Sequence, residues 1–221
     1  NTSQNVAIHS TGTSSHAERQ SVIQSYLSSI ESDNTRVEFI ANISGRQDLK
    51  GGAILSELKI YSKLAGKYID DYTFNYVYSS SVPGNEYTND LLNDTSYIHH
   101  RLKLSGISHN GDPAYNTLQP QFWTFEYNQT PLPSRRSFAQ DHWGFYNGAV
   151  NNTSLLPRVF SFSPITPGAN YVSQDGFTPN NYHDLGGIKS PDEKTMQAEM
   201  LTKIIYPTGG QSQFVYEGNA G

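Results

Sequence analysis

The chain has 221 residues and a formal net charge of −5, and only 16% of its residues are charged. This balance provides no basic stripe for phosphates, which argues against nucleic acid or an anionic membrane surface as a partner, and no apolar run approaches the roughly 20 residues of a membrane-spanning helix. Cysteine is absent, which excludes disulfides and cysteine-ligated metals, whereas 15 Tyr, 10 Phe, 18 Gly and 11 Pro favour strands and turns. We therefore expect one mainly β module over residues 1–221.

The N-terminal segment is polar and carries little pattern. Residues 1–14 are expected to be frayed, and the stretch SSHAERQSVIQSYL can form a short helix after Ser15. The first recurring unit begins at the end of this stretch.

One pattern occurs four times: Leu-x-x-Ile/Leu, a gap of variable length, and a strand centred on Phe. The first strands contain Leu27 with Ile30, Leu55 with Leu58, Leu104 with Ile107, and Leu201 with Ile204. The second strands are centred on Phe39, Phe74, Phe125 and Phe214. Turn-forming residues separate the two strands of each unit, namely Asp33-Asn34, Gly66, Asn110-Gly111 and Pro207-Thr208-Gly209-Gly210. Each unit is therefore predicted to be a β-hairpin.

The second strand of each hairpin alternates with a period of two, which places successive side chains on opposite faces of a sheet. In the second unit the aromatic face is expected to be buried and the other face wet, with the aromatic positions being Tyr72, Phe74, Tyr76 and Tyr78. Since a lone hairpin is marginal in water, the four units should lie side by side as a curved antiparallel sheet.

Two long insertions, residues 79–100 and 128–190, interrupt the hairpins. The second insertion is rich in Pro, Asn and Gly, and we expect it to end in a short helix over residues 191–200. Ser190 is the expected N-cap, Pro191 takes the first helical position, and Glu193 completes a capping box. The helix would lead into the final hairpin, residues 201–217.

The segment LPSRRSFAQDHWGFYNG (132–148) concentrates chemically versatile side chains. The candidate ligand-binding residues are Arg135, Arg136, Asp141, His142, Trp143 and Tyr146. A hydrolase interpretation would use Ser134 or Ser137 as the nucleophile and His142 as the base, but the segment lacks a Gly-x-Ser-x-Gly elbow and the separated supports of a triad. We therefore expect no catalysis and favour a structural role, in which an arginine pairs with Asp141 while Trp143 and Phe145 plug the end of the sheet.

The aromatic residues also suggest carbohydrate binding, because sugars stack their apolar faces on such rings. The pool for this alternative is Tyr76, Tyr78, Trp123, Tyr127, Trp143 and Tyr146. No metal or cofactor is predicted, since the adjacent His99 and His100 would face opposite sides of a strand and no metal-binding motif occurs.

The motif Asp141-His142-Trp143-Gly144, followed by Tyr146-Asn147-Gly148 and later by the turn Tyr-Pro-Thr-Gly-Gly at 206–210, resembles large secreted or surface proteins of Bacteroidetes with RHS/YD repeats. The resemblance covers roughly residues 50–221. It implies a module just upstream of a hairpin array, with the final hairpin as the first repeat, an extracellular or cell-surface location, and adjacent repeat domains of a longer chain as partners.

Three functions remain open at this stage. The preferred one is a non-catalytic scaffold that starts or caps a hairpin array. The alternatives are a module that binds a glycan or a partner protein, and a hydrolase that uses the loop 134–143.

Overall fold

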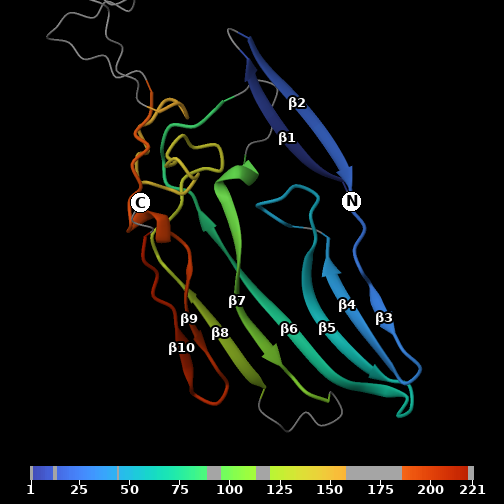
Figure 1. Cartoon of the computed structure of the whole chain (residues 1–221). Coiled ribbons are helices and arrows are strands. Elements are labelled where there is room, and N and C mark those ends of the chain that lie inside the picture. The colour runs from blue at the N-terminus through green and yellow to red at the C-terminus, as the bar shows by residue number, and fades with distance from the viewer. Residues whose placement is uncertain are drawn as a thin grey trace, which may run out of the picture. The chain divides into compact units, whose positions relative to one another are not determined.

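The computed structural model describes residues 2–11, 14–43, 45–88, 96–112, 120–157 and 186–218 (Figure 1). The chain, treated above as a single module, divides into two compact units. We call residues 1–81, 89–129 and 199–215 the sheet unit, and residues 82–88, 130–198 and 216–221 the loop unit. The two long insertions thus contribute together to the loop unit.

The sheet unit contains an eight-stranded antiparallel sheet in which neighbours along the chain are neighbours in space. Its order is β10-β9-β8-β7-β6-β5-β4-β3, and every pairing is antiparallel. The strands are β3 (Ser29–Glu31), β4 (Thr35–Asn42), β5 (Ile54–Ser62), β6 (Lys67–Ser80), β7 (His100–His109), β8 (Gln121–Tyr127), β9 (Leu201–Ile205) and β10 (Gln211–Gln213). The expectation of a mainly β fold built from successive hairpins is confirmed, and the sheet is open, with β3 and β10 at its edges.

The four predicted hairpins are β3–β4, β5–β6, β7–β8 and β9–β10 (Figure 1). Their Leu and Phe positions meet across the junctions, because the directly opposed pairs are Phe39 with Leu58, Phe74 with Ile107, and Phe125 with Ile204. Opposed residues of an antiparallel pair point to the same face. These paired residues therefore form one apolar face that joins neighbouring hairpins. Two members of the pattern lie outside their expected strands and are exposed: Leu27 precedes β3, and Phe214 follows β10 and donates its N–H to the Thr202 carbonyl at 2.9 Å.

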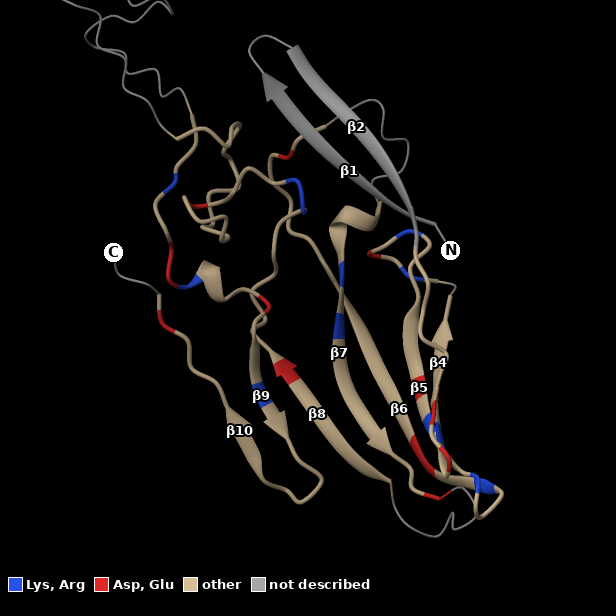
Figure 2. Ribbon diagram, turned by 45° about the vertical axis from the view of Figure 1, so that its right-hand side comes forward, with Lys and Arg blue, Asp and Glu red and all other residues tan. Residues whose placement is uncertain are grey.

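The other face of the sheet carries ion pairs. Lys203 on β9 lies opposite Glu126 on β8, with 2.7 Å between Nζ and Oε2, as neighbouring blue and red bands show in Figure 2. Lys59 and Glu57 of β5 make a second contact of 2.7 Å. This face is wet, as the alternation predicts.

The apolar face is less covered than we expected. Tyr72, Phe74, Tyr76 and Tyr78 are half-buried. Among the residues whose burial is described, the buried hydrophobic ones are Ala53, Ile98, Ala139 and Ala198. The segment 45–53 covers one end of this face, since Gln47 donates its N–H to the Tyr78 hydroxyl at 3.1 Å. The prediction that this face is buried is therefore only partly correct: its side chains are half-buried, because in the described residues the sheet forms a single layer.

At the N-terminus, β1 (Thr2–Thr11) and β2 (Ser14–Ile23) form a separate antiparallel hairpin. The short helix suggested after Ser15 is therefore wrong. The region is rich in Ser, Thr and β-branched residues, which favour extended backbone over helix. Residues 1–14, expected to be frayed, contribute β1.

The helix expected over residues 191–200 is also wrong in extent. Only the 3-10 helix η3 (Thr195–Gln197) forms, and a second 3-10 helix, η1, spans Ser96–His99. The first turn is closed by Asp192, whose Oδ1 accepts the N–H of Thr195 at 2.7 Å, so the predicted cap at Ser190 is not used. Glu199 has a φ of 58°, a left-handed conformation that ends any helix before β9.

Candidate functional site

The loop unit brings together two segments that are distant in the sequence. Val82 forms a parallel bridge with Pro133, and Glu86 forms an antiparallel bridge with Ser137. The N–H of Tyr87 also donates to the Arg136 carbonyl at 3.0 Å. The part of the first insertion that follows β6 is thereby fixed against the start of the second insertion.

Buried asparagine side chains hold the loop unit together. Asn152 donates to the carbonyls of Phe138 at 3.1 Å and Ile188 at 3.0 Å, and its Oδ1 accepts the N–H of Ile188 at 2.8 Å. Asn147 donates to the carbonyls of Ile188 and Ser190 at 2.8 and 3.2 Å. The two buried amides thus tie residues 138, 188 and 190 of this irregular segment together, and Asn152 is the acceptor of the Ile188 N–H.

The loop between Gln140 and Tyr146, which bridge each other, is organised by a buried carboxylate. Asp141 is only 3% exposed, and its Oδ1 accepts the N–H groups of Trp143 at 2.8 Å and Phe145 at 2.9 Å. Gly144 supplies the positive φ of 90° that the turn requires. We call residues 141–145 the tip loop.

The tip loop displays its aromatic residues instead of burying them. Trp143 is 66% exposed and Phe145 is 51% exposed. The expectation that both residues plug the sheet is therefore wrong, because the hydrogen bonds of Asp141 fix the backbone with these side chains outward. The expected pairing of Asp141 with an arginine is replaced by these two main-chain bonds.

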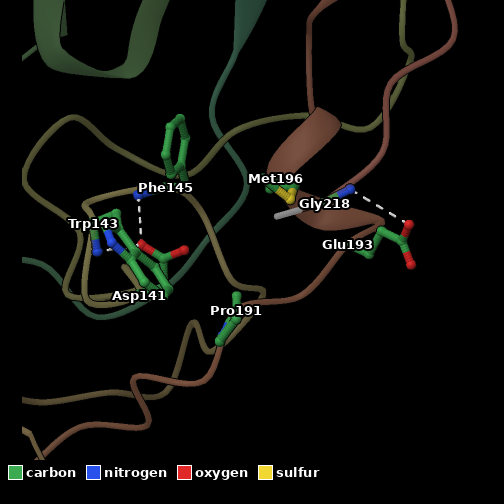
Figure 3. A pocket seen from close by; sticks show the side chains of 7 residues that line it. All are labelled: Asp141, Trp143, Phe145, Pro191, Glu193, Met196 and Gly218. Atoms are coloured by element: carbon green, nitrogen blue, oxygen red, sulfur yellow. Dashed lines mark hydrogen bonds between the residues drawn. The ribbon is translucent and has the colours of Figure 1, made fainter. Parts of the chain in front are cut away.

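A pocket of about 290 Å³ lies beside the tip loop within the loop unit (Figure 3). It is lined by Asp141, Trp143, Phe145, Pro191, Glu193, Met196 and Gly218. Glu193 Oε1 accepts the N–H of Gly218 at 3.4 Å, which connects the residues before η3 to the segment after β10. The pocket combines apolar side chains with two carboxylates.

A buried lysine lies close to the same aspartate. Lys189 is 9% exposed, and burial lowers the pKa of its ammonium group, while the Asp141 carboxylate acts in the opposite direction. Lys189 lines a second cavity of about 230 Å³ together with His142, Pro157, Gly187, Ile188 and Ser190. The partly desolvated ammonium group of Lys189 and the buried carboxylate of Asp141 thus lie close to each other at the base of the tip loop.

The six candidate residues are distributed over different surroundings. Asp141 and Trp143 line the first pocket and His142 lines the second, whereas Arg135, Arg136 and Tyr146 line neither. Burial raises the pKa of the Tyr146 phenol, and the nearby Asp192 acts in the same direction. The structure therefore brings only part of the predicted set together.

The pocket also contains residues that sequence reasoning did not select, namely Pro191, Glu193, Met196 and Gly218. The first three had been assigned to a helix, which concealed them as ligand contacts. The buried framework residues Asn147, Asn152 and Lys189 were missed as well. The one sequence feature that could have indicated these framework residues is the high proportion of Asn and Gly between residues 147 and 152.

The residues of the hydrolase alternative occupy structural positions. Ser137 is buried, and its hydroxyl accepts the N–H of Ala139 at 3.1 Å, while the hydroxyl of Ser134 accepts the N–H of Arg136 at 3.2 Å. His142 is exposed and meets the Trp143 ring edge-on, with 6.3 Å between ring centroids. Both serines thus serve local turns.

Two further observations concern the described residues alone. They contain no group of three or more His, Cys, Asp or Glu side chains placed to hold a metal ion. Among them no helix has the length and apolar character needed to cross a membrane.

The fold and the site together define an open antiparallel β-sheet protein with a second, loop-rich unit, in which a hydrogen-bonded loop exposes aromatic side chains. Comparison with protein-family models, with curated proteins and with solved structures gave no match for this chain.

Proposed function

We propose that this protein is a non-catalytic scaffold module of a bacterial cell-surface or secreted protein of the RHS/YD-repeat type. The carrying observation is the row of four hairpins in which a Phe of one hairpin meets a Leu or Ile of the next in register at each of the three junctions. A sheet built in this way grows by adding one hairpin to the edge of the last, since each addition extends the same apolar face.

The edge strand β10 supports this role. Phe214 donates its N–H toward β9, and Ser212 pairs with Ile204. Because main-chain groups alternate along a strand, the N–H groups of Gln211 and Gln213 point away from β9 and are available to a further strand. Adjacent repeat domains of the same longer chain are the partners that we propose for this edge.

An appended hairpin tests the proposal. A copy of residues 201–217, joined to the C-terminus by a flexible linker, should pair with β10 and slow hydrogen exchange of the Gln211 and Gln213 amides by about tenfold or more. A scrambled copy of the same composition is the control. Unchanged exchange with both appendages would contradict the scaffold role.

A second candidate function is recognition of a surface glycan or a partner protein by the tip loop. The observation that favours it is the exposure of Trp143 beside a pocket, on a loop whose backbone is held by Asp141. Rigid loops that present aromatic side chains are common in binding sites. Binding of the labelled protein to a glycan array, lost on Trp143→Ala, would support the glycan form of this function.

A further inference from the structure

The pocket beside the tip loop is lined by more negative charge and more hydrogen-bond acceptors than positive charge and donors. Among the described residues that line it, Asp141 and Glu193 are acidic and none is basic. In this described part of the lining the strong side-chain acceptors are carboxylate oxygens, and the one side-chain N–H or O–H donor is the indole of Trp143. The pocket thus offers acceptors and negative charge to a ligand.

This inventory distinguishes between ligand classes. A sugar hydroxyl both donates and accepts hydrogen bonds, so a buried sugar would leave its own acceptors without partners here. The charged group of an organic cation carries no acceptor: a protonated amine or a guanidinium only donates, and a quaternary ammonium does neither. Both kinds gain from the electron-rich face of an aromatic ring as well as from a carboxylate. The apolar contacts offered by Phe145, Pro191 and Met196 suit the carbon atoms of such a cation.

Of the two carboxylates, Glu193 is the better partner for the ligand. Asp141 is buried, uses Oδ1 for two main-chain bonds and has the Lys189 ammonium group nearby. Glu193 is exposed and accepts a single long bond from Gly218 through Oε1. Figure 3 shows its carboxylate and the Trp143 indole at different sides of the pocket.

We propose that the pocket binds an organic cation, an alkylated ammonium or guanidinium group that is either a free small molecule or a basic side chain of a partner. The proposal rests on the recognition function suggested for the tip loop. Glu193 neutralises the charge, Trp143 contributes its ring face, and the Asp141 bonds hold the loop in place before binding, which limits the entropy lost on association. A volume of about 290 Å³ admits one such group, near the lower end of the about 300–1,000 Å³ typical of ligand sites.

The two tryptophans, Trp123 and Trp143, provide the readout. The indole N–H resonances of the ¹⁵N-labelled protein are assigned with Trp143→Phe and followed during titration with tetramethylammonium chloride, with sodium chloride at the same ionic strength as the reference. We expect the Trp143 resonance to shift and saturate while the Trp123 resonance stays in place. Choline and Nα-acetyl-arginine amide then distinguish a free quaternary ammonium ligand from a basic side chain.

Matched controls separate the charge effect from simple apolar binding. Glu193→Gln should weaken tetramethylammonium binding by about fivefold or more, whereas Glu217→Gln, an equal charge change at an exposed residue outside the lining, should leave it unchanged. tert-Butyl alcohol, a neutral ligand of similar shape, should bind more weakly. Equal shifts with the alcohol, no shift with any cation, or a shift with a methyl glycoside alone would each overturn the proposal, and none of these results bears on the scaffold role.

Discussion

At the scale of single residues, buried side-chain amides hold the described part of the loop unit together. Asn152 makes three hydrogen bonds to the main chain and is almost fully buried. Asn152→Ala removes these three bonds and leaves the buried N–H of Ile188 without its acceptor, whereas the carbonyls of Phe138 and Ile188 each keep one other donor, Gln140 and Asn147. We therefore expect the free energy of unfolding of the loop unit to fall by about 1–3 kcal/mol. Urea unfolding followed at Trp143 measures this loss.

The neighbouring Asn151 gives a matched control for this substitution. Asn151 is exposed, and its main-chain carbonyl accepts a hydrogen bond from the Asn85 side-chain amide at 3.0 Å. Asn151→Ala should therefore change the free energy of unfolding by less than about 0.5 kcal/mol. Equal effects of the two substitutions would show that the amide bonds of Asn152 do not stabilise the unit.

Lys189 gives the loop unit a dependence on pH. Burial lowers the pKa of Lys189 in the folded protein below its usual value of 10.5. Between the folded and unfolded pKa values the unfolded chain binds more protons, so the contribution of Lys189 to the free energy of unfolding increases as the pH rises through this window. The wild type should gain stability relative to Lys189→Met as the pH rises toward 10.5, measured by urea unfolding. Parallel pH curves of the two proteins would contradict this assignment.

At the scale of elements, the pairing of β7 with β8 depends on the absence of one side chain. A Cβ on Gly106 would lie 2.9 Å from the carbonyl oxygen of Trp123, which is main chain and has little room to move. Gly106→Ala should therefore destabilise the sheet unit by about 1–3 kcal/mol, as overpacking does elsewhere, which urea unfolding followed at Trp123 measures. The neighbouring Ser105→Ala, expected to change stability by less than about 0.5 kcal/mol, is the control. An unchanged unfolding midpoint for Gly106→Ala would contradict the close approach.

The sequence predicts the elements of the sheet because their signals are local. Period-two alternation around Phe74 and turn residues such as Gly66 and Gly111, both with positive φ, depend on residues a few positions apart. The helix over 191–200 was expected from equally local signals, but Asp192 and the backbone of Glu199 produced a single 3-10 turn instead. Capping preferences depend on neighbouring residues alone, so they do not predict the backbone conformation that leads the chain into β9.

At the scale of the whole molecule, the site could be predicted only in part. Asp141 and Trp143 were recognised because they cluster in the sequence, whereas Glu193, Met196 and Gly218 reach the pocket from 50 or more residues away along the chain. The contacts that bring them there are side-chain to main-chain bonds across the loop unit, such as those of Asn147 to Ile188 and Ser190. Bonds of this kind leave no periodicity in a sequence, so the division into two units was not foreseen.

This division leads to a prediction about cooperativity, for which each unit carries its own tryptophan. Trp123 belongs to the sheet unit and Trp143 to the loop unit. Because distant substitutions without shared partners act independently, Asn152→Ala should lower the urea midpoint reported by the Trp143 indole resonance and leave that of Trp123 in place. Gly106→Ala should do the reverse, and the double variant should show both shifts unchanged in size. If either substitution lowers the urea midpoints reported by both indole resonances to the same value, the two units unfold in a single cooperative transition. That result would contradict independent unfolding of the two units.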